Sequence, residues 1–305
     1  MSSSMSRSSV ASDLAGPAGP SARDGALPPL PKRKADAVAP EGRELREVRQ
    51  HRRLATFRTI SALMLREMST SHGKSSGGYL WSILEPVGGI ALLTLIFSMG
   101  FRTPPLGTNF AIFYATGVIP FMGYLELSSK VAGSIGYSKA LLGYPAVTFM
   151  DALLARIIFN TITHVIVAPL IFTFIVTFME TRTHPQILGI GTAMAMMVVL
   201  AAGVGTLNSF LFAAFPWWQS VWSIMMRPLF LVSCIFFVFD TIPLPYRDWL
   251  WWNPLVHVVG QMRSSFYPSY RADYVSHVYV FALSLALLVV GLALLIRYHR
   301  DLQNS

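Results

Sequence analysis

Long runs without charged side chains dominate the chain between residues 80 and 298. Residues 103–125, 157–179 and 274–296 each contain 23 residues with no Asp, Glu, Lys or Arg. A membrane-spanning helix needs about 20 predominantly apolar residues, and it satisfies its backbone hydrogen bonds internally. The pattern therefore predicts six transmembrane helices, at residues 82–101, 109–128, 150–178, 187–213, 219–239 and 274–296.

The segment before the first long run has a different pattern, in which apolar residues recur with the period of a helix. One side of this helix carries five apolar residues: Leu54, Phe57, Ile60, Met64 and Met68. Thr59 and Arg66 lie on the opposite side. A basic amphipathic helix typically lies in the membrane interface, although the pattern also fits a helix packed on a soluble partner. We expect an interfacial helix and the entrance of the chain into the membrane within residues 43–79.

Composition supports a membrane protein with a polar tail. The chain is 53% hydrophobic and only 13% charged, whereas soluble domains carry about 25% charged residues. The first 78 residues hold 13 of the 24 basic and 7 of the 15 acidic residues. Such a basic flank indicates a segment facing anionic lipid, and nucleic-acid binding is not expected because no basic patch with interleaved aromatic residues occurs outside the tail. Residues 1–42, rich in Ser, Ala, Pro and Gly, are predicted to be disordered.

Basic residues also predict the orientation of the helices, because loops rich in Lys and Arg stay in the cytoplasm. Basic residues precede the first helix, lie between the second and third helices, and follow the sixth. They are Arg52, Arg53, Arg58, Arg66, Lys74, Lys130, Lys139, Arg156, Arg297 and Arg300. Both termini are therefore expected in the cytoplasm. The expected fold is all-α and integral to the membrane, with a six-span domain at residues 80–298 and a cytoplasmic C-terminus at residues 299–305.

Motifs for catalysis or nucleotide binding are missing from the sequence. Gly73-Lys74-Ser75 resembles the end of a phosphate-binding loop, but the first glycine of that motif would fall at Met68. Neither a zinc-binding H-E-x-x-H nor an Asp-x-Asp motif occurs, and Cys234 is the only cysteine. We expect no cofactor or metal in this chain. A membrane-bound sugar or acyl transferase is the alternative from a different class.

The charged residues Glu85 and Arg227 fall inside predicted helices. A charge at the bilayer centre costs roughly 2.5–3.5 kcal/mol on insertion scales, so such residues usually face protein or water. The two side chains are expected either to line a hydrated conduit, where they could pair, or to extend to nearby headgroups.

Two loops have distinctive composition. Residues 129–149 place an apolar and basic element between glycines, which suits either a lever that docks on a soluble partner or an ordinary interfacial loop. Residues 240–272 are rich in aromatic residues, which form either an interfacial belt or flat surfaces for sugar rings. Within this loop, His257 to Arg263 could form a short re-entrant helix after Pro254.

Four blocks, in order, carry a resemblance to a known family. They are Leu65-Arg66-Glu67 with Gly78-Tyr79-Leu80-Trp81 and Glu85-Pro86; Ala140-Leu141-Leu142-Gly143-Tyr144-Pro145-Ala146-Val147 with Asp151 and Ala155-Arg156; Arg227-Pro228-Leu229-Phe230; and Trp252-Asn253-Pro254-Leu255 with His257 and Arg263. Together they resemble the membrane permeases of type-2 ABC exporters, specifically those that export capsular polysaccharide. The sequence departs from the family at Cys234, where glycine is common.

The resemblance implies an exporter in the bacterial inner membrane, built from two copies of this chain and two soluble ATPase subunits that bind ATP and magnesium. Periplasmic and outer-membrane export proteins would receive the polysaccharide. It implies three groups of functional residues: Trp81, Glu85 and Arg227 lining the channel; Tyr137, Lys139, Leu141, Leu142, Tyr144 and Pro145 coupling to the ATPase; and Trp249, Trp251, Trp252, Asn253, Pro254 and Arg263 at the periplasmic exit. Exporters of O-antigen or teichoic acid, which share the architecture, are the alternative.

Overall fold

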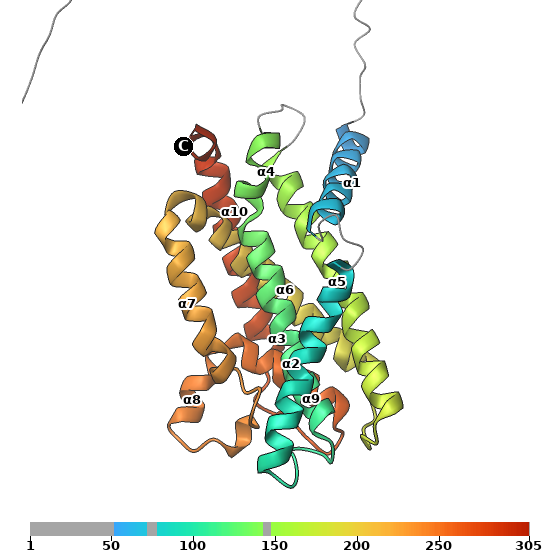
Figure 1. Ribbon diagram of the computed structural model, residues 1–305. Coiled ribbons are helices and arrows are strands. Elements are labelled where there is room, and N and C mark those ends of the chain that lie inside the picture. Colours follow the sequence, from blue (N-terminus) through green and yellow to red (C-terminus); the bar gives the residue numbers. More distant parts are fainter. Residues whose placement is uncertain (1–51, 72–77, 143–147, 305) are drawn as a thin grey trace, which may run out of the picture. The chain divides into compact units, whose positions relative to one another are not determined.

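A computed structural model describes residues 52–71, 78–142 and 148–304, and every regular element within these ranges is a helix (Figure 1). In chain order the elements are α1 (Arg52–Ser71), α2 (Gly78–Gly100), α3 (Phe110–Ala132), α4 (Ser134–Leu142), α5 (Phe149–Phe178), α6 (Ile187–Ala214), α7 (Pro216–Val232), the short 3-10 helix η1 (Phe239–Thr241), α8 (Tyr246–Trp251), α9 (Pro254–Phe266) and α10 (His277–Asn304). The expected tail at residues 1–42 lies outside the described residues.

Five of these helices, α2, α3, α5, α6 and α10, are long and apolar enough to cross a membrane. They correspond to five of the six predicted spans, with ends that differ by a few residues. The span predicted at residues 219–239 is different, because α7 has only 17 residues and ends at Val232. At 1.5 Å per residue it is about 26 Å long, which is shorter than the roughly 30 Å thickness of the hydrocarbon core.

The end of α7 has a local cause. After the C-cap residue Ser233, Cys234 adopts a positive φ of 58°, the left-handed conformation that usually terminates a helix at a glycine. The next residues turn away from the helix axis, and the carbonyl oxygens of Ile235 and Phe237 accept hydrogen bonds from Arg263 on α9. A prediction from hydropathy alone extends the helix to residue 239 because residues 234–239 are all apolar.

The core is centred on α3 and α6, which carry many of the buried side chains. The contact between α6 and α10 depends on glycines. A Cβ at Gly203 would overlap the carbonyl oxygen of Ser284, and one at Gly291 would lie 2.7 Å from the backbone nitrogen of Leu207. Small residues of this kind allow helix backbones to approach closely inside membranes.

Short helices lie at the two ends of the long ones. Figure 1 shows α4 near the C-terminal end of α10, and α8 and α9 at the opposite end. The helix predicted at His257 to Arg263 is present as α9, which begins with Pro254 and has ten of its 13 residues buried. The side chain of Asn253 caps α9 by accepting a hydrogen bond from the backbone N–H of Leu255 at 3.0 Å.

Candidate functional site

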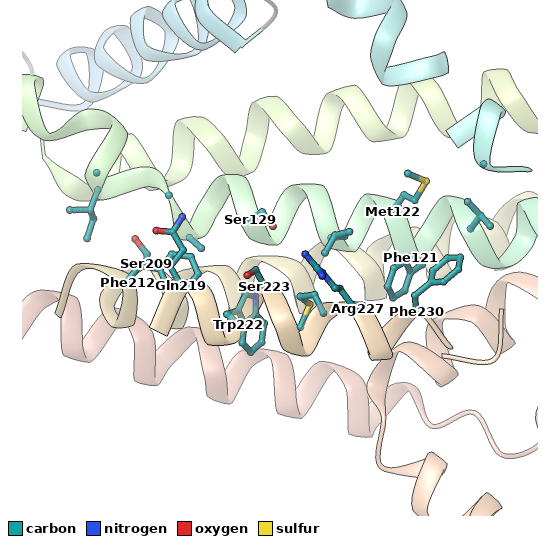
Figure 2. Close-up of a pocket in the computed structure, with 18 of the residues that line it drawn as sticks. Phe121, Met122, Ser129, Ser209, Phe212, Gln219, Trp222, Ser223, Arg227 and Phe230 are labelled. Atoms are coloured by element: carbon teal, nitrogen blue, oxygen red, sulfur yellow. The ribbon is translucent and has the colours of Figure 1, made fainter. Parts of the chain in front are cut away.

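A cavity of about 1000 Å³ runs along α7, with α2, α3, α4 and α6 forming its other walls (Figure 2). Residues four apart lie on one face of a helix, and α7 presents two such rows to the cavity. The polar row consists of Gln219, Ser223 and Arg227, and the apolar row beside it consists of Trp222, Met226 and Phe230. Of these six residues only Arg227 was predicted to line a channel, although the spacing of both rows can be read from the sequence.

Arg227 is the only charged residue among the described residues that line this cavity. Figure 2 shows its side chain extending from α7 into the space between α7 and α3. The side chains of Ser129 and Ser209 add hydroxyl groups from α3 and α6. A guanidinium inside a membrane helix usually faces water, an anion or backbone carbonyls, and one that lines an open cavity can receive an anionic group.

Aromatic rings occupy both ends of the same cavity. Phe121 of α3 and Phe230 of α7 meet edge to face, with ring centroids 5.2 Å apart. Trp222 of α7 and Phe212 of α6 line the cavity on the other side of Arg227 from this pair (Figure 2). Flat apolar rings interleaved with hydroxyl and amide groups can contact a chain that is polar at its edges and less polar on its faces, as sugars are.

Glu85 lies in a different, smaller cavity of about 190 Å³ bounded by α2, α3, α5 and α6. There it shares the wall with Glu126 and His164, whose Oε2 and Nε2 atoms are 3.5 Å apart. Helix α3 contributes residues to both cavities, and Glu85 and Arg227 line different ones. The third predicted channel residue, Trp81, is 63% exposed and lines neither cavity.

The predicted coupling residues lie in and beyond α4. Lys139, Leu141 and Leu142 belong to the helix, whereas Tyr144 and Pro145 fall outside the described residues. The ring of Tyr137 is half-buried beneath two guanidinium groups, those of Arg156 and Arg66, whose Cζ atoms lie 4.1 Å and 4.8 Å from its centroid. Tyr137 is therefore engaged with other helices of its own chain.

Two residues of the second sequence block have structural partners. Asp151 forms a capping box with Thr148 at the start of α5. Arg156, two turns further on, places its Nε 3.3 Å from the Oε2 atom of Glu67 on α1, and both side chains are buried. The buried role of Glu67 was not predicted, although this residue lies at the edge of the apolar side of the predicted interfacial helix, next to Ile60.

The predicted exit residues divide into exposed and buried groups. Trp249 and Trp252 are 79% and 67% exposed. Trp251 instead packs inward, where its indole N–H donates to the carbonyl of Tyr274 at 3.1 Å. Its own carbonyl lies 2.8 Å from Nε2 of His257, whose Nδ1 accepts from the backbone N–H of Ser276 at 3.2 Å. This arrangement requires a neutral ring protonated on Nε2, and burial lowers the pKa of His257.

Asn253 and Arg263 hold α9 against the end of α7. Asn253 donates to the carbonyl of Val232 at 3.3 Å and to the hydroxyl of Ser233 at 3.2 Å. Arg263 is fully buried and donates to Phe237 and Ile235, while its guanidinium lies 4.3 Å from the centroid of a phenylalanine ring on α3. Within one copy of the chain these two residues fasten helices together; Arg263 is buried, whereas Asn253 stays partly exposed.

Residues 58–267 match the ABC-2 type transporter family. This match covers more than half of the chain, so the chain belongs to that family of membrane transport proteins. The kinship inferred from the four sequence blocks is thereby confirmed.

Several relatives carry names that refer to polysaccharide export. The chain is 35% identical over 237 residues to the polysialic acid transport protein KpsM of Escherichia coli, covering 77% of this chain and 92% of the relative. It is 26% identical to the capsule polysaccharide export inner-membrane protein CtrC of Neisseria meningitidis serogroup A and 24% identical to BexB of Haemophilus influenzae, each alignment covering 81% of this chain and 93% of the relative.

Proposed function

We propose that this chain is the transmembrane permease subunit of an ATP-driven exporter that moves lipid-linked capsular polysaccharide across the bacterial inner membrane. The observation that carries the proposal is the cavity along α7, which combines aromatic rings, hydroxyl groups and the single cation of Arg227. Such a lining favours an acidic, hydroxyl-rich polymer. The names of the relatives, which refer to polysialic acid and capsule polysaccharide, support the same substrate class.

In the proposed topology α7 is a sixth, short transmembrane helix, and both termini lie in the cytoplasm. α1 then lies at the cytoplasmic interface and α4 faces the cytoplasm, whereas α8 and α9 face the periplasm. The basic residues that flank the helices on the α4 side support this orientation. A short helix is compatible with spanning, because α9 and the turn after Cys234 continue the protein beyond Val232.

The proposed assembly contains two copies of this chain. Apolar side chains beside the cavity, including Ile224 and Leu231 on α7 and Leu95 on α2, are more than half exposed in one copy. Those nearest the cavity are available to a second copy, whose own cavity would complete a channel. Two soluble ATPase subunits would bind ATP and magnesium and act on α4, and periplasmic and outer-membrane export proteins would receive the polymer.

Surface staining of capsule in a gene-deletion strain tests this function. Complementation with the wild-type chain should restore polysaccharide at the surface, and the uncomplemented strain should accumulate polymer inside the cell. Complementation with Arg227→Gln should reduce surface polymer severalfold, whereas Arg227→Lys should retain more because it keeps the cation in the cavity. A deletion strain that makes no polymer at all would contradict export and favour an enzyme of polymer synthesis.

A further inference from the structure

One arginine side chain joins three other helices at the α4 end of the protein. Arg156 of α5 lies 3.3 Å from the carboxylate of Glu67 on α1. Its Nη1 donates to the carbonyl of Lys130 near the end of α3 at 2.6 Å. Its guanidinium lies 4.1 Å from the ring centroid of Tyr137 on α4, and Arg66 of α1 lies over the same ring. We call Arg66, Glu67, Tyr137 and Arg156 the arginine–tyrosine cluster.

The cluster is tightly packed. The side chains of Glu67 and Arg156 are only 3% and 9% exposed. The space that the cluster encloses with its neighbours is about 10 Å³, close to the least that can hold one water molecule. Close-packed groups have low compressibility and pass displacement to their neighbours, and separating a buried ion pair is costly. A displacement of α4 must therefore displace α1 and the start of α5.

The first residues of α4 contact α6 and border the large cavity. The hydroxyl of Ser134 lies 3.1 Å from that of Ser209 on α6, which is one neutral hydrogen bond. Ile135 and Gly136 line the cavity along α7. One side of α4 is thus fixed to the arginine–tyrosine cluster while the adjacent side forms part of the cavity wall.

We propose that the arginine–tyrosine cluster transmits movement of α4 to α1 and α5, and that Tyr137 is an internal positioning residue instead of a contact for the ATPase. This inference rests on the proposed function, because the force on α4 comes from the ATPase partner. The aromatic ring of Tyr137, which carries both arginine contacts, is the part that matters. Rotation of α4 about this fixed point moves Ile135 and Gly136 and changes the width of the cavity at that end.

The test uses the permease–ATPase complex in membrane vesicles, with ATP hydrolysis and polymer export measured on the same preparation. Tyr137→Ala should leave ATP hydrolysis within about twofold of wild type but lower export per ATP about tenfold, as expected for loss of the cation–π contacts. Tyr137→Phe should restore export, because it keeps the ring. The matched control is Tyr298→Ala on α10, which removes another tyrosine next to an arginine and should leave export unchanged.

A second variant addresses the case in which Tyr137→Ala fails to accumulate. Arg156→Lys keeps the charge opposite Glu67 but loses the planar group that stacks on the ring, and it should also lower export per ATP. The inference is overturned if Tyr137→Phe is as defective as Tyr137→Ala, or if either substitution of Tyr137 releases the ATPase from the permease. A wild-type complex that hydrolyses ATP without exporting polymer would instead refute the proposed function.

Discussion

Two buried arginines, one near each end of the helices, make an instructive pair. Arg156 and Arg263 each lie over an aromatic ring, at 4.1 Å and 4.3 Å from the centroid, and each donates to backbone carbonyls near a helix end. Arg156 also has a carboxylate partner in Glu67. Among the described residues Arg263 has no carboxylate partner and relies on the carbonyls of Ile235 and Phe237.

The difference lies in what each arginine connects. Arg263 makes two hydrogen bonds to one backbone segment, which fixes α9 to the turn after α7 as a unit. The negative end of a helix dipole favours a cation at that position even without a carboxylate. Arg156 instead joins side chains and backbone from three separate helices, so a displacement of one of these helices is passed to the others. The α9 end is built for rigidity and the α4 end for transmission.

The largest loss of stability is expected from the substitution Arg263→Met. This substitution leaves two buried carbonyl oxygens without donors, and each lost partner costs about 1–3 kcal/mol, so the free energy of unfolding should fall by about 2–6 kcal/mol. Thermal unfolding of the purified protein in detergent measures the change. Arg263→Lys, which can satisfy one carbonyl, should lie between this variant and wild type. An unchanged Tm for Arg263→Met would show that the turn after α7 does not need the arginine.

A smaller loss of stability is expected from Glu67→Gln. The amide retains the shape of the carboxylate but removes the charge opposite Arg156, and hydrogen bonds to charged groups contribute about 1.5–3 kcal/mol. Because Arg156 keeps its contacts with Lys130 and Tyr137, part of the stability remains. In the same unfolding measurement, Glu67→Gln and Arg263→Lys should lower stability additively, since distant sites do not couple. Clear non-additivity would mean that the two ends are mechanically linked.

The smallest expected change is in how the stability of the protein depends on pH. The pKa of His257 is lowered in the folded protein, and its Nδ1 accepts a hydrogen bond from Ser276. As pH falls below about 6.5, the unfolded chain binds the proton first. Stability should therefore decrease from pH 8 to pH 5, by an amount on the order of 1 kcal/mol. His257→Gln should flatten this dependence in parallel unfolding curves, whereas an unchanged slope would assign it to other groups.

Hydropathy was sufficient for the positions of the long helices, because the membrane leaves few alternatives to a helix for an apolar run. It predicted α3, α5 and α6 to within a few residues. It failed at the end of α7, where the boundary depends on Cys234 and on a hydrogen bond from Arg263, 28 residues further along the chain. Contacts of this kind join distant segments and leave no periodic signal.

The candidate site was predictable only in part. Arg227 stood out as a charge within an apolar run. The spacing of four residues that places Gln219 and Ser223 in one row with Arg227, and the position of Trp222 beside that row, can also be read from the sequence. That Glu85 and Arg227 line different cavities was not predictable, because it depends on how α2, α3 and α7 pack together. Two side chains of opposite charge, each inside a helix, can thus line different cavities.

The left-handed turn at Cys234 has a practical consequence for chemical labelling. This thiol is the only one in the chain and is fully buried, and burial raises its pKa to about 12. Since the thiolate is the reactive form, maleimide reagents should leave the folded native protein unmodified. Single cysteines introduced at Trp249 or Phe57, which are both highly exposed, would then report which face of the membrane each reaches without removal of the native residue.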